Sequence, residues 1–340
     1  MSADGDARAA AGAAPLRVVV VGGTGNISTP LVHALAADGH EVTVFVRGTR
    51  TRALPGGVRV LHGDRTDRAE FEALMRCERF DAAFDMVCFT PQDAESDLRA
   101  FDGVRHLVHT STISTFGGPL AEVPANESTP LRPITPYGSD KARADEVLLD
   151  AHRRSGFPVT VLKPAHTWGP GLPVIRQLAV EDPHWLGRLR AGKPLLIADD
   201  GLARWSVCHS EDAVQAYVGL LGRPSAFGET YVVTSPEPLT WIDYHQQIAD
   251  ALGATLRLVH APADELLRLW PEGTELLAAG TRWDACFDVA KLQAAVPQFR
   301  PSIALRDRAA EHVAFMEAAA PPPRDGGRED AILEALGHAG

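Results

Sequence analysis

Short apolar runs alternate with longer amphipathic segments through the first half of the chain. The runs are rich in β-branched residues and lie at 16–23, 41–46, 58–64, 80–89, 105–112 and 158–164. Uninterrupted apolar runs of this kind are typical of strands that are buried on both faces of a parallel sheet. The segments between them predict helices, one closed by Gly39, one around residues 68–76 and one that begins at Pro136. This alternation predicts an α/β fold with a doubly wound parallel sheet.

The first apolar run ends in a glycine turn that precedes a helix. Glycines let the backbone approach a pyrophosphate, and the helix that follows supplies free N–H groups and the positive end of its dipole. Ser28 stands where the usual pattern has a third glycine, and a small side chain is tolerated there. An ordinary tight turn is the alternative, but the position after the first strand favours a Rossmann-type dinucleotide site. The expected contacts are Gly22, Thr24, Gly25, Asn26 and Ile27.

The second strand lacks the carboxylate that NAD-binding domains place at its end for the ribose 2′-hydroxyl. Three arginines follow it instead, Arg47, Arg50 and Arg52, with Arg47 about where the acid would be. Guanidinium groups suit a 2′-phosphate by charge and geometry, so NADP is favoured over NAD, and a solvated basic loop is the alternative. Asp64, at the end of the third strand, is a candidate contact for the adenine amino group or a plain turn residue.

The regular alternation loosens after Pro164, where glycine and proline become frequent. We therefore expect a dinucleotide-binding Rossmann domain over residues 15–165 and a smaller, mainly substrate-binding C-terminal domain over residues 166–316. Residues 205–225 are expected to return to the first domain. Residues 1–14 predict a disordered arm, and residues 317–340 predict a linker and a C-terminal tail or short helix.

Tyr137 and Lys141 stand four residues apart near the start of the helix that begins at Pro136. On a helix this spacing places both side chains on one face. A free phenol has a pKa of about 10, too high for a base at neutral pH. A lysine ammonium one turn away would stabilise the phenolate and lower that pKa. The pair therefore predicts an acid/base site, and the alternative is two exposed neighbours on a helix.

Charge and composition argue against several classes of function. The chain has 340 residues and a net charge of −11, so no basic surface dominates that would hold nucleic acid through its phosphates. No apolar run approaches the ~18 residues of a membrane span, and the first residues carry acids, unlike a secretory signal. The four cysteines form no CxxC pair and predict buried thiols in a reducing compartment. We expect a cytoplasmic protein with no metal site and with no nucleic-acid or membrane partner.

Five motifs together resemble the extended short-chain dehydrogenase/reductase family, in its NAD(P)-dependent epimerase/dehydratase group. They occur in the family's order as VVVVGGTGNIS at the first strand, HTSTISTFG at the fifth, YGSDK at 137–141, LKPAHTWGPG at 162–171 and HSEDAV at 209–214. The resemblance covers roughly residues 16–315, and the motifs are specific when taken together.

The resemblance implies a role for each matching residue. Tyr137 would be the acid/base of a hydride transfer to or from nicotinamide, and Lys141 would also hold the nicotinamide ribose. The hydroxyl that orients the substrate would be Thr112, four residues before Phe116-Gly117, with the adjacent Ser111 as a fallback. Pro164 would lie beside the cofactor.

Two departures from the family's pattern bear on the reaction and the substrate. Sugar 4,6-dehydratases of the family carry an Asp-Glu pair after the catalytic threonine, whereas this chain has Ile113-Ser114, so an elimination route is not favoured. Nucleotide-sugar enzymes hold a diphosphate with an arginine four residues before a histidine like His209. Here that place is Trp205, with Arg204 one residue further, so either the arginine is shifted or the substrate lacks a diphosphate.

His166 and Trp168, after the Lys-Pro-Ala segment, are candidates to line a substrate pocket, and a loop histidine is the alternative for His166. We therefore predict an NAD(P)-dependent epimerase or oxidoreductase acting on a hydroxyl or keto carbon of a sugar, nucleotide sugar or nucleoside. We expect it to be a homodimer. One alternative is an NADPH-dependent ketoreductase of a small-molecule biosynthetic pathway.

A second alternative belongs to a different class. The turn GGTGNIS, with Arg-Gly after the second strand, is similar to a bacterial branch related to chloroplast stem-loop-binding proteins, some of which bind RNA. The chain would then be a non-catalytic cofactor-binding or RNA-associated regulatory protein. The intact Tyr137, Lys141 and Thr112 and the acidic charge disfavour this alternative.

Overall fold

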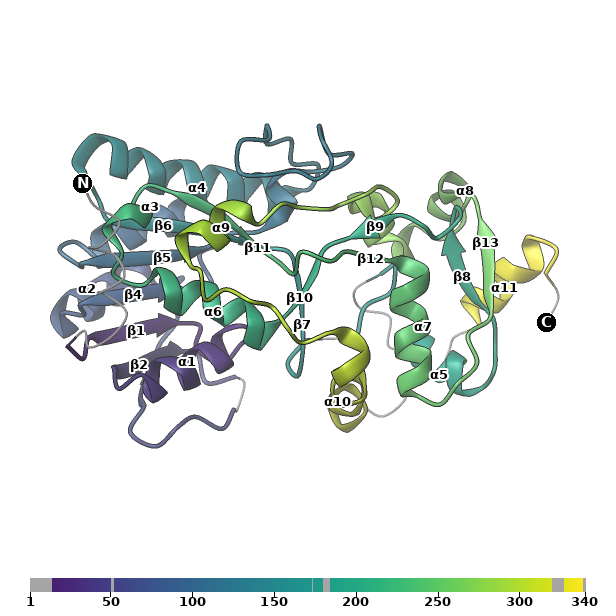
Figure 1. Cartoon of the computed structure of the whole chain (residues 1–340), viewed down its shortest axis with the longest axis horizontal. Helices are drawn as coiled ribbons and strands as arrows, with labels where there is room; N and C mark the ends of the chain where they lie inside the picture. The colour runs from purple at the N-terminus through teal and green to yellow at the C-terminus, as the bar shows by residue number, and fades with distance from the viewer. Residues whose placement is uncertain (1–13, 50–51, 173, 180–183, 320–326, 339–340) are drawn as a thin grey trace.

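A seven-stranded parallel sheet dominates the computed structural model, which describes residues 14–49, 52–172, 174–179, 184–319 and 327–338 (Figure 1). In spatial order its strands are β11 (Thr230–Val233), β6 (Val159–Pro164), β5 (His106–Thr110), β4 (Ala82–Asp85), β1 (Arg17–Val21), β2 (Glu41–Val46) and β3 (Arg59–His62). All neighbouring strands in it run parallel. From β1 the chain first adds strands on one side of the sheet, β2 and β3, and then on the other side, beginning with β4. At this switch between β1 and β4, a parallel sheet has a crevice at its carboxyl edge. The predicted Rossmann-type fold class is confirmed.

Helices cover both faces of the sheet because alternate strand residues point to opposite sides. Val18 and Val20 of β1 pack in one apolar cluster with helices on one face, and Val19 and Val21 pack in another cluster on the other. The first face carries α1 (Ser28–Ala37), α6 (Ser210–Leu220) and α9 (Ala290–Ala295). The second carries α2 (Arg68–Glu78), α3 (Pro91–Ala100) and α4 (Pro136–Ser155).

Two strands end earlier than their apolar runs predict. β4 ends at Asp85 and β5 at Thr110, although the runs continue to residues 89 and 112. Most of the remaining residues leave the sheet at its carboxyl edge and line cavities there. The apolar side chains at the ends of these runs, such as Met86, Val87 and Phe89, therefore form cavity walls and do not extend the strands.

The second part of the molecule lies beside the sheet, with β7 and β10 between the two parts (Figure 1). It contains three two-stranded sheets, β7 (His166–Trp168) with β10 (Val207–His209), β9 (Arg204–Trp205) with β12 (Leu239–Thr240), and β8 (Leu195–Ala198) with β13 (Leu258–Ala261). Its helices are α5 (His184–Arg190), α7 (Trp241–Ala251), α8 (Ala263–Leu269), α10 (Leu305–Ala319) and α11 (Arg328–Ala335). Short helical turns lie at Ile113–Thr115, Pro224–Ala226, Pro271–Gly273 and Leu277–Thr281.

The chain crosses between the two parts more than once. α6 packs against α1, β11 pairs with β6, and α9 packs against β11, so late segments complete the first part. Beyond α10, where a linker and a tail or short helix were predicted, α11 docks on the second part with Ile332 and Leu333 buried. No helix within the described residues combines the length and apolar character needed to cross a bilayer.

Candidate active site

Two cavities open at the carboxyl edge of the sheet and share Gly22, Gly25, Val87 and Phe89 in their walls. The large cavity, of about 570 Å³, extends from the glycine turn past the ends of β5 and β6 to the second part of the molecule. The small cavity, of about 370 Å³, lies along the ends of β2 and β3. Together they offer an extended site that bends at the glycine turn.

The glycine turn fits a pyrophosphate. Gly22 has φ +83°, and a Cβ there would lie 2.6 Å from Val87 Cγ1, so a side chain would fill the cradle. No side chain caps the N-terminus of α1 at Ile27. The Thr29 N–H donates to the Gly25 carbonyl and Pro30 has no N–H, so the N–H groups that an anion could use are those just before them in the turn. Asn26 donates from Nδ2 to Thr167, while its buried Oδ1 has no hydrogen-bond partner among the described residues. Thr24 lines the small cavity, and Asn26 and Ile27 line the large one.

The small cavity has a charged rim. Arg47 and Asp64 are both exposed and line it. Asp64 accepts hydrogen bonds from the Thr66 N–H at 2.9 Å and hydroxyl at 2.8 Å, and these lower its pKa, with a smaller effect of the Arg47 charge. Asp64 is therefore a turn residue that also faces the cavity. Arg50 lies outside the described residues, and Arg52 stacks over the Phe315 ring at 4.7 Å instead.

A buried ion-pair network that sequence reasoning missed supports the floor of the small cavity. Arg65 donates to Asp85 at 2.5 Å and to Asp97 at 2.9 Å. Burial and the nearby Asp85 raise the pKa of Asp97 well above its ordinary value. Asp85, Cys88 and Asp97 offer ligand atoms within 4.8 Å of one another, but the Arg65 cation supplies the counter-charge there. The cluster is accounted for as an ion-pair network.

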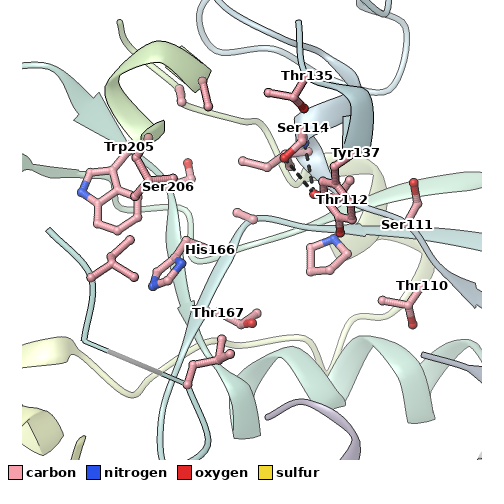
Figure 2. Close-up of a pocket in the computed structure, with 18 of the residues that line it drawn as sticks. Thr110, Ser111, Thr112, Ser114, Thr135, Tyr137, His166, Thr167, Trp205 and Ser206 are labelled. Atoms are coloured by element: carbon pink, nitrogen blue, oxygen red, sulfur yellow. Dashed lines mark hydrogen bonds between the residues drawn. The ribbon is translucent and has the colours of Figure 1, made fainter. Parts of the chain in front are cut away.

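Tyr137 and Thr112 line the large cavity (Figure 2), and Lys141 lies buried beside it, hydrogen-bonded to the carbonyl of the lining residue Thr110. Thr135 caps α4 by accepting from Gly138 N–H, which sets the helix start so that Tyr137 faces the cavity. Tyr137 is 47% exposed as a whole residue, with its phenol in the cavity wall, whereas Lys141 is buried and donates to the carbonyls of Cys88 at 2.7 Å and Thr110 at 2.6 Å. The Thr112 hydroxyl donates to Ser114 Oγ at 3.2 Å and accepts from Ser114 N–H.

The expected lowering of the Tyr137 pKa by Lys141 is not found. Burial raises the pKa of the Tyr137 phenol, and a hydrogen bond with Thr112 opposes that rise. The Lys141 ammonium is directed to two backbone carbonyls, and burial lowers its own pKa. The Lys141 charge therefore does not offset the effect of burial on the pKa of the Tyr137 phenol.

Ser111 lines the large cavity, but its hydroxyl proton is directed to a buried carboxylate. Its Oγ donates to Asp145 at 2.7 Å, and Asp145 also pairs with Lys163 and with His109. Lys163 is the main stabilising partner that holds the pKa of Asp145 down, at about 2, despite burial. Asp145 lies one turn beyond Lys141 on α4, a spacing from which sequence reasoning could have found it.

The far wall of the large cavity is aromatic and uncharged. His166 and Trp205 line it with ring centroids 4.9 Å apart, and Trp205 stacks on Trp241 at 3.9 Å. Burial lowers the pKa of His166 to about 3, so the ring is neutral. Pro164 and Trp283 also line the cavity. Its described lining contains no Asp, Glu, Lys or Arg side chain.

Two predicted substrate contacts do not reach the described lining of this cavity. Trp168 is 1% exposed and packs in the core of the second part, 4.5 Å from the His209 ring, because β10 lies beside β7. Arg204 is exposed and pairs with Asp284 at 2.6 Å, while its neighbour Trp205 faces inward. Ser114, Ser206, Trp241 and Trp283 line the cavity although the sequence did not single them out.

A dinucleotide cradle that leads into a tyrosine–lysine pair is the arrangement of enzymes that move a hydride to or from nicotinamide. The residues present fit such a cofactor, with the pyrophosphate at the glycine turn. The chain belongs to the NAD dependent epimerase/dehydratase family, whose model matches residues 18–234, within the extended short-chain dehydrogenases/reductases. The predicted family and its enzymatic, NAD(P)-dependent character are confirmed.

Relatives of this chain include enzymes with different reactions. It is 35% identical over 285 residues to 2′-dehydrokanamycin reductase of Streptomyces kanamyceticus, which covers 84% of this chain and 80% of that protein. It is 24% identical over 251 residues, 70% of this chain and 63% of the other, to chloroplast stem-loop binding protein of 41 kDa b of Arabidopsis thaliana. Bacillus cereus UDP-glucuronic acid 4-epimerase, solved with UDP-glucuronic acid and NAD, shares the fold with a TM-score of 0.71 at 15% identity, covering 89% of this chain and 99% of that one.

Proposed function

We propose that this protein is an NADPH-dependent reductase of a ketone on a sugar ring that carries no diphosphate. The observation that carries the proposal is the Tyr137 phenol, which lies with Thr112 in the wall of a cavity whose described lining is uncharged. A protonated phenol suits reduction because the nascent alkoxide needs a proton. The 35% identity with 2′-dehydrokanamycin reductase supports the same direction of reaction.

In this proposal a bound NADPH supplies the hydride to the carbonyl carbon. The Thr112 hydroxyl, which donates to Ser114 Oγ in the structure, turns to donate to the carbonyl oxygen and orients it beside the phenol. As the carbon–oxygen double bond becomes a single bond, the Tyr137 O–H bond breaks and its proton passes to that oxygen. Lys141 uses two of its three N–H donors on the Cys88 and Thr110 carbonyls, and we assign the third to the nicotinamide ribose.

The wall chemistry supports the substrate class. Trp205 and Trp283 give this wall an apolar aromatic surface suited to the C–H faces of a sugar, and the nearby serines and threonines suit its hydroxyls. A diphosphate would require cationic partners, which the described lining lacks, and Arg204 is engaged by Asp284 outside it. Arg47 on the rim of the small cavity, with no acid at the end of β2, supports NADPH over NADH.

A direct assay tests this function. Purified protein is mixed with NADPH and 2′-dehydrokanamycin, neutral keto sugars or UDP-glucose, and NADPH absorbance and products are followed. We expect one NADPH oxidised for each ketone reduced to an alcohol. Interconversion of UDP-glucose without net use of NADPH would instead identify an epimerase. Failure to reduce any ketone or to convert UDP-glucose would contradict the proposal, provided the NADPH-bound protein is folded.

A further inference from the structure

The C-terminal helix α11 is anchored by a carboxylate buried between two arginines. Glu329 accepts hydrogen bonds from both terminal nitrogens of Arg176 at 2.8 Å, and Arg188 Nε lies 3.3 Å away. The same carboxylate accepts from the Leu196 N–H of β8 at 2.7 Å. The Glu329 side chain is 3% exposed and those of the two arginines 1%. A bidentate buried pair fixes orientation as well as distance, so α11 has one docked position.

Apolar contacts reinforce this anchor. Ile332 and Leu333 of α11 are buried in one cluster with Leu178, Leu266 and Leu277. Leu277 begins the helical turn Leu277–Thr281, and Leu276, Ala279, Gly280 and Thr281 of this region line the large cavity. The docked helix thus packs behind one wall of the candidate active site, although it lies about 300 residues after the glycine turn in the sequence.

The segment 174–179 connects the anchor to that wall. Arg176, the partner of Glu329, lies next to Ile175, whose side chain is buried in the wall of the large cavity. Gln177 Oε1 accepts from the Ala198 N–H at 2.7 Å, so the segment is also tied to β8. The Glu329–Arg176 ion pair and the Gln177 side chain therefore fix the segment 174–179 against α11 and β8.

The other side of this segment holds the wall residues directly. The Gln177 carbonyl accepts from the Thr281 hydroxyl at 2.7 Å, and the Leu178 carbonyl accepts from the Leu276 N–H at 3.0 Å. The Thr281 carbonyl in turn accepts from Trp241 Nε1 at 2.9 Å. Hydrogen bonds and chain continuity thus link Glu329 to four residues that line the large cavity, namely Ile175, Leu276, Thr281 and Trp241.

We propose that α11 is part of the substrate site and that Glu329 is its positioning residue, which holds the wall formed by residues 276–283 and so sets the affinity for the substrate. The substrate's identity rests on the proposed ketone reduction, whereas the position of the wall does not. Glu329 touches neither the substrate nor the cofactor in this proposal, and it acts only through Arg176 and the segment 174–179.

The test uses the full-length protein. Glu329→Gln keeps the shape of the side chain but removes its charge, and Ile332→Ala weakens docking without leaving a buried charge unpaired. We expect both to speed backbone hydrogen exchange in residues 276–283 and to raise KM for 2′-dehydrokanamycin roughly 3- to 30-fold, with kcat and NADPH affinity within about twofold. Glu334→Gln, the same change at an exposed position of α11, should alter neither.

Several outcomes would overturn the inference. Unchanged exchange over residues 276–283 in both variants would show that α11 does not hold this wall. A parallel loss of NADPH affinity would show a general loss of folding, and a lowered kcat at unchanged KM would show a role other than substrate affinity. If the unmodified protein reduces no ketone, the proposed function fails, but the hydrogen-exchange comparison still decides whether Glu329 positions the wall.

Discussion

Ser28 Oγ donates a hydrogen bond to the Gly22 carbonyl at 2.6 Å and accepts one from the Gly25 N–H at 2.7 Å. One hydroxyl therefore spans the glycine turn at the position where the family's usual pattern has a glycine. The serine fits tightly, because a Cβ at Gly25 would already lie 3.1 Å from its Oγ. A residue expected only to be small enough for packing instead holds the shape of the pyrophosphate cradle.

Ser28→Ala removes both hydrogen bonds and should weaken NADPH binding. At about 0.5–1.5 kcal/mol for each of the two bonds, the dissociation constant should rise about 5- to 150-fold, as measured by fluorescence titration. Ser155→Ala is the matched control, since that hydroxyl donates to the Ala151 carbonyl at the other end of α4. Unaltered affinity in Ser28→Ala would show that the turn keeps its shape without the serine.

Tyr137→Phe should remove the proton donor while it leaves the cofactor site intact. We expect kcat for ketone reduction to fall by about 10²- to 10⁴-fold and NADPH affinity to remain unchanged. Steady-state kinetics and a binding titration on the same preparation measure the two quantities. Full activity in this variant would rule out the acid/base role.

Thr112→Val and Ser111→Ala separate the two neighbouring hydroxyls. In the proposed function Thr112 orients the substrate carbonyl, so its loss should lower kcat/KM by about 10²-fold. Ser111 donates to the buried Asp145, so its loss should cost roughly 1 kcal/mol of unfolding free energy with little change in rate. Kinetics and urea unfolding of both variants are compared, and the reverse pattern would restore Ser111 as the orienting residue.

NADPH should bind more tightly than NADH, and Arg47→Ala should narrow that difference. A charge-assisted hydrogen bond to the 2′-phosphate is worth about 1.5–3 kcal/mol, so NADPH affinity should fall about 10- to 100-fold while NADH affinity stays constant. Arg52→Ala is the control, because Arg52 stacks on Phe315. Equal affinities of the unmodified protein for the two cofactors would exclude this role for Arg47.

Four buried histidines should make the protein sensitive to acid. Burial lowers the pKa of His106 and His166 to about 3 and of His245 and His312 to about 4. In the unfolded chain they bind protons near pH 6.5, so their contribution to stability is complete above that pH and is lost as pH falls toward 4 and 3. Below pH 6.5 each histidine should lower the free energy of unfolding by up to about 1.4 kcal/mol for each pH unit. Urea unfolding between about pH 7.5 and 5 measures this loss. A constant free energy of unfolding over that range would contradict the neutral, buried assignment.

Local features of the sequence were enough to predict much of the fold and part of the candidate site. Buried parallel strands require unbroken apolar runs, and helical geometry alone puts Tyr137 and Lys141 one turn apart. The glycine turn could be read in the same way, because backbone freedom is a property of the glycines themselves. These inferences depend on neighbours in the chain, so they needed no knowledge of distant segments.

Only the tertiary structure decided which side chains face the cavity and what the charged groups do there. Lys141 could not be directed to the Cys88 and Thr110 carbonyls without the ends of β4 and β5 beside α4. Asp145 and Lys163 turn Ser111 inward, and the packing of β7 beside β10 buries Trp168. The docked α11 depends on Arg176, more than 150 residues earlier. Such contacts join segments that are remote in sequence, and burial then changes the pKa of each group, so no local pattern specifies them.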